Sequence, residues 1–417
     1  MAIKRYAVVG VGGRGTGMFA LPLAKDFPKT AELVAVCDNN AVRANYCVSR
    51  LPRPVPAYTD FGRMLRMTEP DAIVVATRDC THEQYIVAGL KAGKRVYSEK
   101  PLCTTAAQCR TILAAAKRSR GPCFVTHNLR YSAAGQQIRD IIRAGTLGRV
   151  TLMRFDETLD RCHGADYFRR WHRQLANCGG LLIHKASHHF DLLNWWADAK
   201  PATVRAQGRL AVYGHNGAFR GKRCRGCAHA RKCPFHVDMF QHEVHRKMYL
   251  EAEGEDGYLR DGCVFDRSID ICDQMGALIH YQNDIQVSYT LNAFCPYESM
   301  RCVVEGTEGR LEYGCVYNTG WMAGAKRLPG LEEQAGESLR LFLAGKKVKH
   351  IPVREQEGGH GGADPALRAE FFGDWKKKPS DRMASIEEAV QAVMVGAAAN
   401  EAIRTGKTVD VQKLLGA

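Results

Sequence analysis

A glycine-rich segment near the N-terminus constrains the possible folds of this chain more than any other feature. Residues 3–9, IKRYAVV, have the apolar pattern of a short strand, and a helical pattern follows the glycines. In the pattern G-x-G-x-x-G, the first glycine permits a tight turn, the second lets backbone approach a pyrophosphate, and the third lets helix and strand pack closely. Unpaired amides at the helix N-terminus also attract phosphate. The segment predicts dinucleotide contacts at Gly10, Gly12, Gly13, Arg14 and Gly15.

An acidic residue at the end of the next strand completes this pattern. The predicted strand Glu32–Cys37 is followed by Asp38, whose carboxylate can accept a hydrogen bond from a ribose 2′-hydroxyl. No arginine follows immediately, which favours NAD over NADP. Arg43 lies about one helical turn further on and keeps NADP open as the less favoured cofactor.

Strands and helices continue to alternate up to about residue 128. Such β-α-β alternation predicts a doubly wound parallel sheet that binds its ligand at the carboxyl ends of the strands. The further strands expected are Asp71–Thr77, Lys94–Ser98 and Pro122–Thr126, and the helices are Thr59–Met67, Thr81–Ala92 and Thr104–Ser119.

Three strand ends carry polar residues that would face this ligand. They are Thr77-Arg78-Asp79, Glu99-Lys100-Pro101 and His127-Asn128. A lysine at a strand end is ordinarily a solvated charge. At the mouth of a dinucleotide site, Lys100 becomes a candidate for catalysis. The cofactor contacts predicted in this region are Thr77, His82, Glu99 and Lys100.

The stretch Cys178–Trp196, CGGLLIHKASHHFDLLNWW, places polar groups in an otherwise apolar sequence. If it is helical, His184, His188 and Asp191 fall at i, i+4 and i+7 and share one face. Buried polar groups cost free energy unless they are paired or used. A hydrogen-bonded structural cluster and a zinc pair of His184 and His188 are the alternatives to an active site.

These motifs together resemble the glucose–fructose oxidoreductase/inositol dehydrogenase (Gfo/Idh/MocA) family. They are the glycine-rich turn, the strand-end Glu99-Lys100-Pro101 and the pattern GG-x₃-[D/H]-x₃-H-x₂-D, and the resemblance covers nearly the whole chain. It implies an α/β protein with an N-terminal Rossmann domain and a C-terminal α/β domain, whose open, mostly antiparallel sheet often makes the oligomer interface. It also implies that Lys100 and His188 border the nicotinamide and the sugar. In many relatives the Lys-Pro bond is cis.

One position departs from the family's pattern. Dehydrogenases of this family usually carry aspartate four residues before the histidine, where this chain has His184. A carboxylate there would hold the tautomer of the imidazole and stabilise its charged form, whereas a second imidazole would do neither in the same way. The chain therefore resembles an atypical branch.

The family resemblance leaves two alternatives to a dehydrogenase. The family also contains NAD-dependent glycosidases, which oxidise a sugar hydroxyl transiently, eliminate the aglycone and return the hydride. The other alternative is a non-catalytic dinucleotide sensor, against which the presence of both Lys100 and His188 argues.

We divide the chain into an NAD-binding domain, residues 1–128, and a substrate-binding and oligomerisation domain, residues 129–417. An insertion at residues 213–262 has little apolar periodicity. It contains three cysteines and one histidine in the pattern CxxC-x₅-CxxH. Such spacing is typical of a small structural zinc site, which would stabilise a segment that lacks its own core. Free thiols are the alternative, because no second CxxC follows. The candidate zinc ligands are Cys224, Cys227, Cys233 and His236.

The remainder of the second domain reads as an antiparallel sheet closed by a helix. Short spans alternate apolar and polar residues between turns. Residues 314–362 read as irregular, and the glycine-rich loop 358–364 holds His360, either as a connector or in close approach to a sugar. The predicted strands are Thr203–Val212, Val264–Ile271, Ala277–Tyr281, Ile285–Asn292, Met300–Glu305 and Arg310–Tyr313, and the helix is Ile386–Thr405.

Composition excludes several classes of protein. The 59 basic and 44 acidic residues give a net charge of +15, but no dense basic block with interleaved aromatics suggests a nucleic-acid partner. No apolar run approaches the ~20 residues of a membrane span, and the N-terminus favours a cytoplasmic location. The 16 cysteines are mostly isolated, which argues for reduced thiols. The basic excess favours anionic small molecules such as a dinucleotide.

The predicted function is NAD-dependent hydride transfer between the cofactor and a hydroxyl-bearing carbon of a sugar, cyclitol or sugar derivative. His188 would remove the hydroxyl proton, Lys100 would polarise the oxygen, and His184 would be a relay or a substrate contact. Asp191 would orient an imidazole or have a structural role. The predicted substrate contacts are Asn128, Tyr131, Tyr167, Arg169, Trp171, His184 and His360. We expect a homodimer or homotetramer.

Overall fold

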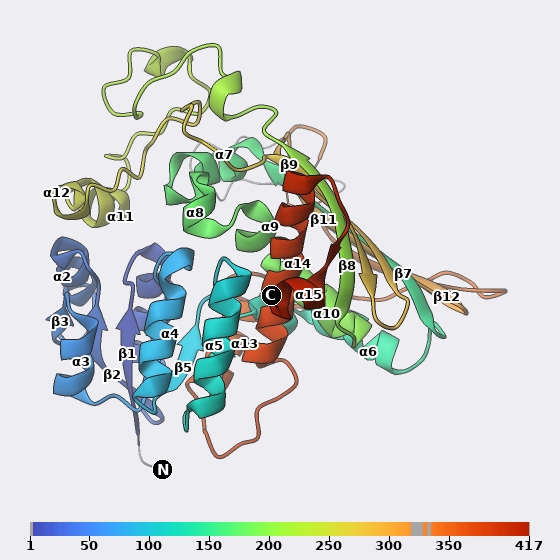
Figure 1. Ribbon diagram of the computed structural model, residues 1–417, viewed down its shortest axis with the longest axis horizontal. Coiled ribbons are helices and arrows are strands. Elements are labelled where there is room, and N and C mark those ends of the chain that lie inside the picture. The colour runs from blue at the N-terminus through green and yellow to red at the C-terminus, as the bar shows by residue number, and fades with distance from the viewer. Residues whose placement is uncertain (1–2, 318–327, 332–334, 417) are drawn as a thin grey trace.

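Two β-sheets and the helices around them form the protein (Figure 1). The computed structural model describes residues 3–317, 328–331 and 335–416. The first sheet has seven strands in the order β15-β6-β5-β4-β1-β2-β3. The second has nine in the order β14-β13-β12-β11-β7-β10-β9-β8-β16. The predicted fold class, a Rossmann domain followed by an α/β domain with a mostly antiparallel sheet, is confirmed.

The first sheet is parallel except for one edge strand. Its strands are β1 (Lys4–Val9), β2 (Ala31–Cys37), β3 (Ala57–Tyr58), β4 (Ala72–Val75), β5 (Arg95–Ser98), β6 (Cys123–Val125) and β15 (Ala384–Ser385). Strand β4 is buried along its whole length, as expected where helices cover both faces of a parallel sheet. The helices are the π-helical η1 (Gly15–Ala20), α1 (Leu21–Lys25), α2 (Ala41–Ser49), α3 (Phe61–Thr68), α4 (His82–Lys91) and α5 (Ala106–Arg118).

The C-terminal part of the chain returns to complete the first domain. Strand β15 pairs with β6 in the antiparallel direction. The hydroxyls of Tyr6 and Tyr97 both donate to the carbonyl oxygen of Phe371, the last residue of α13 (Ala363–Phe371), at 3.0 and 2.9 Å. The predicted boundary at residue 128 thus follows the last parallel strand, but residues 363–385 also belong to the core of this domain.

The second sheet forms the other half of the molecule. Its strands are β7 (Val150–Asp160), β8 (Pro201–Arg209), β9 (Gln274–Tyr281), β10 (Gln286–Cys295), β11 (Glu298–Gly306), β12 (Gly309–Tyr317), β13 (Gly336–Leu343), β14 (Lys349–His350) and β16 (Val409–Asp410). Only β10 and β7 pair in parallel, and the other described pairs are antiparallel. The remaining helices are α6 (Ala133–Arg143), α7 (Arg161–Arg169), α8 (Leu175–Cys178), α9 (Leu181–His184), α10 (Ser187–Ala197), α11 (Glu243–His245), η7 (Arg246–Leu250), α12 (Glu253–Asp256), α14 (Ile386–Thr405) and α15 (Val411–Gly416).

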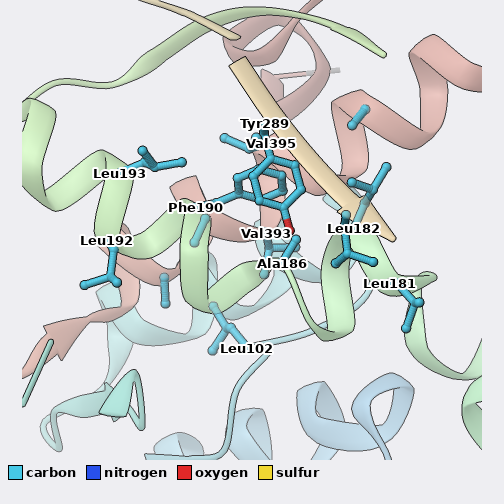
Figure 2. Packing of buried hydrophobic residues seen from close by; sticks show 14 of the residues in the cluster. Leu102, Leu181, Leu182, Ala186, Phe190, Leu192, Leu193, Tyr289, Val393 and Val395 are labelled. Carbon is cyan, nitrogen blue, oxygen red and sulfur yellow. The ribbon is translucent and has the colours of Figure 1, made fainter. Parts of the chain in front are cut away.

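Helices α10 and α14 pack against the second sheet and bury the main apolar core. In Figure 2, Phe190 of α10 lies beside Tyr289 of β10, with Val393 and Val395 of α14 close by. The rings of Phe190 and Tyr289 are 4.8 Å apart between centroids, and all four side chains are buried. The predicted helix over 386–405 has the bounds of α14. This packing fixes the position of α10, which carries His188.

The helix predicted through residues 181–196 is broken. Helix α9 ends at His184, and α10 begins at Ser187 after a turn of two residues. The amides of Lys185 and Ala186 both bond to the carbonyl of Leu181. His184 and His188 therefore do not share a single continuous helical face.

Three other predictions for the second domain differ from the structure. Residues 264–271 form turns rather than a strand, although Ile269 and Ile271 are buried. Their apolar alternation comes from a packed loop. The stretch 314–362 contains the end of β12, then β13 and β14, and β7 is not indicated by the sequence pattern. No helix among the described residues is both long and apolar enough to cross a membrane.

Candidate active site

A cavity of about 900 Å³ runs along the carboxyl ends of the first sheet's strands and under the second domain. At one end it is lined by the glycine-rich turn and Asp38. At the other end it is lined by Lys100, His184 and His188. The two motifs that the sequence singled out therefore face the same space.

The glycines at the turn are required by close backbone contacts. Gly10 has φ +83°, and a Cβ there would lie 2.6 Å from the backbone of Ala76. A Cβ on Gly15 would lie 1.9 Å from the carbonyl oxygen of Gly10. Because the chain turns this tightly, Gly12, Gly13 and Arg14 line the cavity just before η1. Gly15 itself shapes the turn and is not part of the cavity wall.

Asp38 is buried at the end of β2, with Arg43 beside it. Its carboxylate accepts hydrogen bonds from the amides of Val11 and Asn40, each at 3.0 Å, and from the Arg43 guanidinium at 2.9 Å. Burial raises the pKa of Asp38, although Arg43 and the two amides oppose the shift. A carboxylate has roughly four acceptor sites, so one remains for a ribose hydroxyl.

A chain of ion pairs connects the glycine-rich turn to the loop before α13. The Arg14 guanidinium lies 2.6 Å from Glu99 and 3.3 Å from Asp364. Asp364 also accepts hydrogen bonds from Asn128 at 2.7 Å and from His360 at 2.9 Å. These contacts hold His360 at the cavity, where it is 45% exposed at its side chain. His360 therefore lies where a substrate contact was predicted.

Lys100 lies just after the end of β5, near the carboxylates of Glu99 and Asp79. The Lys100–Pro101 peptide bond is cis, as in many proteins of the family that the motifs resemble. The ammonium donates to the carbonyl oxygen of His184 at 2.9 Å. Burial lowers the pKa of Lys100 to about 8, although the carboxylates of Glu99 and Asp79 oppose the shift. A pKa in this range lets the amine gain or lose a proton near neutral pH.

His184 has a carboxylate partner from the other domain. Its Nδ1 lies 2.5 Å from Oδ2 of Asp79, at the end of the first sheet. Burial lowers the pKa of His184 well below its usual value and raises that of Asp79 to about 7. Both shifts come first from burial, which disfavours a separately charged imidazolium and carboxylate. Asp79 thus supplies a carboxylate that the helix itself lacks.

His188 faces the cavity from the first turn of α10. Only 7% of the residue is exposed, and its Nδ1 has no hydrogen-bond partner among the described residues. Burial lowers its pKa well below the usual value, and the nearby charges of Lys100 and Lys185 add to that effect. At neutral pH His188 is therefore uncharged and able to accept a proton.

Aromatic and imidazole rings form the wall opposite the first sheet. Trp171 stacks on His172 with ring centroids 3.5 Å apart, and His172 lies 4.2 Å from the ring of His184. The hydroxyl of Tyr167 is 3.0 Å from Nε2 of His163. All five residues line the cavity. The predicted substrate contacts Tyr167 and Trp171 thus belong to this wall.

Several predicted site residues are engaged elsewhere. Asn128 and Tyr131 are fully buried and do not line the cavity. Asp191 forms two hydrogen bonds with Arg130, at 2.7 and 2.8 Å, rather than orienting a cavity histidine. His82 lines the cavity, but its ring nitrogens bond to the carbonyls of Pro101 and Thr77, at 2.8 and 3.2 Å. His82 therefore fixes the backbone beside Lys100.

The zinc prediction for the insertion is not supported. In the described part of the chain, no three Cys, His, Asp or Glu side chains gather as ligands of a metal ion. The Cys224 sulfur accepts a hydrogen bond of 3.8 Å from Arg169, which also donates to the carbonyl of Phe235 at 3.1 Å. Arg223 instead ties the insertion together through ion pairs with Glu253 and Asp261. The residues expected to bind zinc were Cys224, Cys227, Cys233 and His236.

Sequence patterns did not identify several residues of the cavity wall. His172 stands next to a predicted contact, Trp171, and Lys185 stands between the two predicted histidines, so local signals existed for both. Tyr249 lies 236 residues from its partner Gly13, and nothing near it in the sequence indicates that contact. The residues missed include His163, His172, Lys185, Tyr249 and Tyr258.

Two protein-family descriptions match successive parts of the chain. Residues 4–127 match "Oxidoreductase family, NAD-binding Rossmann fold". Residues 139–411 match "Oxidoreductase family, C-terminal alpha/beta domain". The chain is 32% identical over 431 residues to YteT of Bacillus subtilis (strain 168), whose name marks it as a proposed oxidoreductase, with 99% of each chain covered.

Two further proteins show how far the similarity extends. Inositol 2-dehydrogenase of Acidothermus cellulolyticus is 31% identical over 214 residues, which are 49% of this chain and 58% of that protein. A structure of levoglucosan dehydrogenase in complex with NADH matches with a TM-score of 0.71 at 15% identity, over 98% of this chain and 99% of that one. At that identity the structural match shows the fold alone.

Proposed function

Because the chain belongs to the Gfo/Idh/MocA family of oxidoreductases, we propose that it transfers hydride between NAD and a hydroxyl-bearing carbon of a sugar, cyclitol or sugar derivative. The observation that carries this proposal is the single cavity shared by the glycine-rich turn and the pair Lys100 and His188. The names of its relatives, inositol 2-dehydrogenase and levoglucosan dehydrogenase, support a polyhydroxylated substrate.

The cofactor end of the cavity fits a dinucleotide. The turn at Gly10–Gly15 leaves the Gly13 amide facing the cavity, and Asp38 keeps an acceptor site for a ribose hydroxyl. NAD suits this carboxylate better than NADP, whose 2′-phosphate would meet its negative charge. Arg43, 2.9 Å from Asp38, reduces that repulsion without removing it. We therefore propose NAD as the preferred cofactor.

The residues at the other end can accept the hydroxyl proton of the substrate and stabilise the negative charge that develops on its oxygen. When bound, the nicotinamide supplies the acceptor for the two electrons of the departing C–H bond, which leave as hydride. His188, uncharged at neutral pH, takes the hydroxyl proton as the C=O bond forms. The Lys100 ammonium stabilises the negative charge on that oxygen. The His184–Asp79 pair fixes the carbonyl that receives the Lys100 hydrogen bond and so orients the amine.

A direct assay tests this proposal. The purified protein is incubated with NAD and a panel of aldoses, cyclitols and anhydrosugars, and NADH formation is followed at its absorbance maximum. We expect NAD-dependent oxidation of at least one polyhydroxylated compound, lost in the His188→Ala variant that still binds NAD. Activity that is unchanged in that variant would contradict the assignment of the site.

A redox-neutral glycosidase is the second candidate function. The observation that favours it is the ion pair of 3.0 Å between Arg43 and Asp256 of the insertion, which holds the insertion over the cofactor end of the cavity. An enclosed cofactor suits a reaction that returns its hydride to the same substrate. Release of the aglycone from a glycoside without net formation of NADH would support this candidate. Net NADH formation from a free sugar would support the dehydrogenase.

A further inference from the structure

The insertion reaches across the cavity and contacts the first domain around the cofactor end. Figure 1 shows α11 and α12 next to α2 of that domain. The Tyr249 hydroxyl accepts a hydrogen bond from the Gly13 amide at 2.8 Å. The side-chain amide of Asn40 donates to the carbonyl of Ala252 at 2.9 Å. These contacts join η7 and α12 to the turn and helix that hold a dinucleotide in this fold.

Tyr249 occupies the position where the turn offers an amide to a phosphate. A Cβ built on Gly13 would lie 3.2 Å from the Tyr249 hydroxyl, and one on Gly12 would lie 3.5 Å from it. The absence of side chains at both positions therefore leaves room for this oxygen. A phosphate oxygen needs the same donor at the same place. The hydroxyl and the pyrophosphate compete for the Gly13 amide.

Positive charge surrounds Tyr249 on both sides. The guanidinium of Arg43, from the first domain, lies 5.8 Å from the centre of its ring, and that of Arg260, from the insertion, lies 5.9 Å away. Arg260 and Arg170 share the carboxylate of Asp166, at 2.6 and 3.0 Å. On that side one carboxylate faces two guanidiniums, whereas Arg43 is paired with two carboxylates, so the positive charge open to an anion beside Tyr249 lies with Arg260 and Arg170.

An ion pair holds the insertion against the first domain. The Arg43 guanidinium bonds to Asp38 with one nitrogen and to Asp256 of α12 with another, at 2.9 and 3.0 Å. The side chain of Arg43 is only 9% exposed and that of Asp256 16%, so solvent screens the pair weakly. Arg43 therefore connects Asp38, the residue predicted to bind ribose, to the insertion.

We propose that residues 246–258, named the cap, form the outer wall of the dinucleotide site and slow the release of the bound cofactor. In the free protein the Tyr249 hydroxyl holds the Gly13 amide, and it yields that amide to a pyrophosphate oxygen on binding. The Arg43–Asp256 pair then keeps the cap closed over the bound dinucleotide. This inference rests on the proposed use of NAD and adds two residues of the cap, Tyr249 and Asp256, to its binding site.

The release rate of NADH from the full-length protein tests the cap. Asp256→Asn removes the charge that pairs with Arg43. Glu255→Gln makes the same charge change one residue earlier, at an exposed side chain without an ion pair in the described residues. Release is followed by stopped-flow fluorescence after mixing the NADH complex with excess NAD. We expect Asp256→Asn to release NADH about tenfold faster, the scale of one charge-assisted hydrogen bond, and Glu255→Gln to match wild type.

Association provides the second measurement. Tyr249→Phe keeps the ring but removes the oxygen that competes for the Gly13 amide, so NADH should bind a few times faster than to wild type. Equal release rates in all three proteins of the first experiment, or unchanged association with Tyr249→Phe, would overturn the cap. Wild-type protein that binds no dinucleotide at all would remove the proposed function together with the cap. Dinucleotide binding with the predicted rates but without sugar oxidation would leave the cap in place and reject the proposed activity.

Discussion

The two ends of the cavity differ in how completely their charged and titratable side chains are paired. At the cofactor end, the charged side chains beside the glycine-rich turn are paired: Arg43 with Asp38, and Arg14 with Glu99 and Asp364. At the catalytic end, Lys100 bonds to a carbonyl and His188 has an unpartnered ring nitrogen among the described residues. Burial without full pairing is what lowers the pKa values of Lys100 and His188.

This difference separates binding from chemistry. Paired charges hold their protonation states over a wide pH range, so the cofactor end offers a constant electrostatic surface to an anion. Lys100, with its pKa lowered to about 8, changes its protonation near neutral pH, and His188 is uncharged there and can take a proton, which are the states that acid–base catalysis requires. Substitutions at the catalytic end should therefore change turnover and its pH dependence, and those at the cofactor end should change affinity and selectivity.

The largest expected effect is on turnover at the catalytic end. Lys100→Met and His188→Ala should each lower kcat by at least ~10²-fold, the usual scale for loss of an acid–base group, because the hydroxyl proton and the oxygen charge lose their partners. Dinucleotide affinity should stay near that of wild type. Steady-state kinetics and calorimetric NAD titration measure the two quantities. A variant that loses binding and turnover together would break the separation between the two ends.

The next effect concerns selectivity at the cofactor end. Asp38→Ala should weaken NAD binding about tenfold, because the ribose 2′-hydroxyl loses a charged acceptor, and should narrow the preference over NADP. Arg43→Ala is the matched variant and should weaken NADP more than NAD. Dissociation constants for both dinucleotides measure these changes. A wild type that binds NADP at least as tightly as NAD would show that Asp38 does not select the cofactor.

A smaller effect is expected in the pH dependence of the rate. Lys100 has a pKa of about 8, so the ammonium that stabilises the oxygen is lost as pH rises through that value, and kcat should fall on the alkaline side. On the acidic side the fall should come well below the usual histidine range, because the pKa of His188 is lowered. Lys100→Arg should move the alkaline limb upward, since arginine keeps its charge. An alkaline limb at the same pH in both proteins would exclude Lys100 as its source.

The Asp79→Asn variant provides a second test of whether Lys100 is the source of the alkaline limb. The variant removes the carboxylate that bonds to His184 at 2.5 Å and that raises the pKa of Lys100. The alkaline limb should therefore shift to lower pH, whereas a purely structural role would lower the rate equally at every pH.

The smallest effect is on stability in mild acid. Burial lowers the pKa values of His127, His172 and His189 below their usual value of 6.5. Below pH 6.5 the unfolded chain then binds protons that the folded chain does not, so stability falls as pH falls. Each such group contributes at most about 1.4 kcal/mol per pH unit. His127→Asn should flatten the slope of Tm against pH between 6.5 and 5, and an unchanged slope would contradict this account.

Asp364, a carboxylate of the cofactor end, should not contribute in that range. Burial raises the pKa of Asp364, but its contacts with His360 and Arg14 outweigh that effect and hold it below the usual value. The stability that it contributes is present above the unfolded pKa of about 3.8 and is lost only below it.

The cofactor end could be predicted from local sequence, because backbone geometry determines it. Gly10 and Gly15 are required by contacts within a few residues or with the adjacent strand, and Asp38 directly follows its strand. A short sequence pattern can therefore predict these backbone contacts. Most strands and helices of the first domain were predicted for the same reason; the exceptions include α2, which carries Arg43, and the short strands β3 and β15.

The catalytic end depended on contacts between distant segments. The pairing of His184 with Asp79 joins residues 105 positions apart, and no spacing rule connects them. Asp191 showed the opposite problem: its helical spacing placed it with the histidines, but Arg130 binds it inside the core. In the insertion, the ion pairs through Arg223 join residues that are 30 or more positions apart, and the spacing of the cysteines gave no indication of them.

The return of the chain at α13 and β15 has a consequence for synthesis on the ribosome. The first domain's sheet is parallel up to β6, at residue 125, but its edge is closed by residues 384–385. Tyr6 and Tyr97 find their shared acceptor, Phe371, only after residue 371 has been synthesised. A nascent chain that has released only residues 1–128 therefore leaves one edge of β6 unpaired and part of the domain's apolar core uncovered. Both stay open until residues 363–385 emerge.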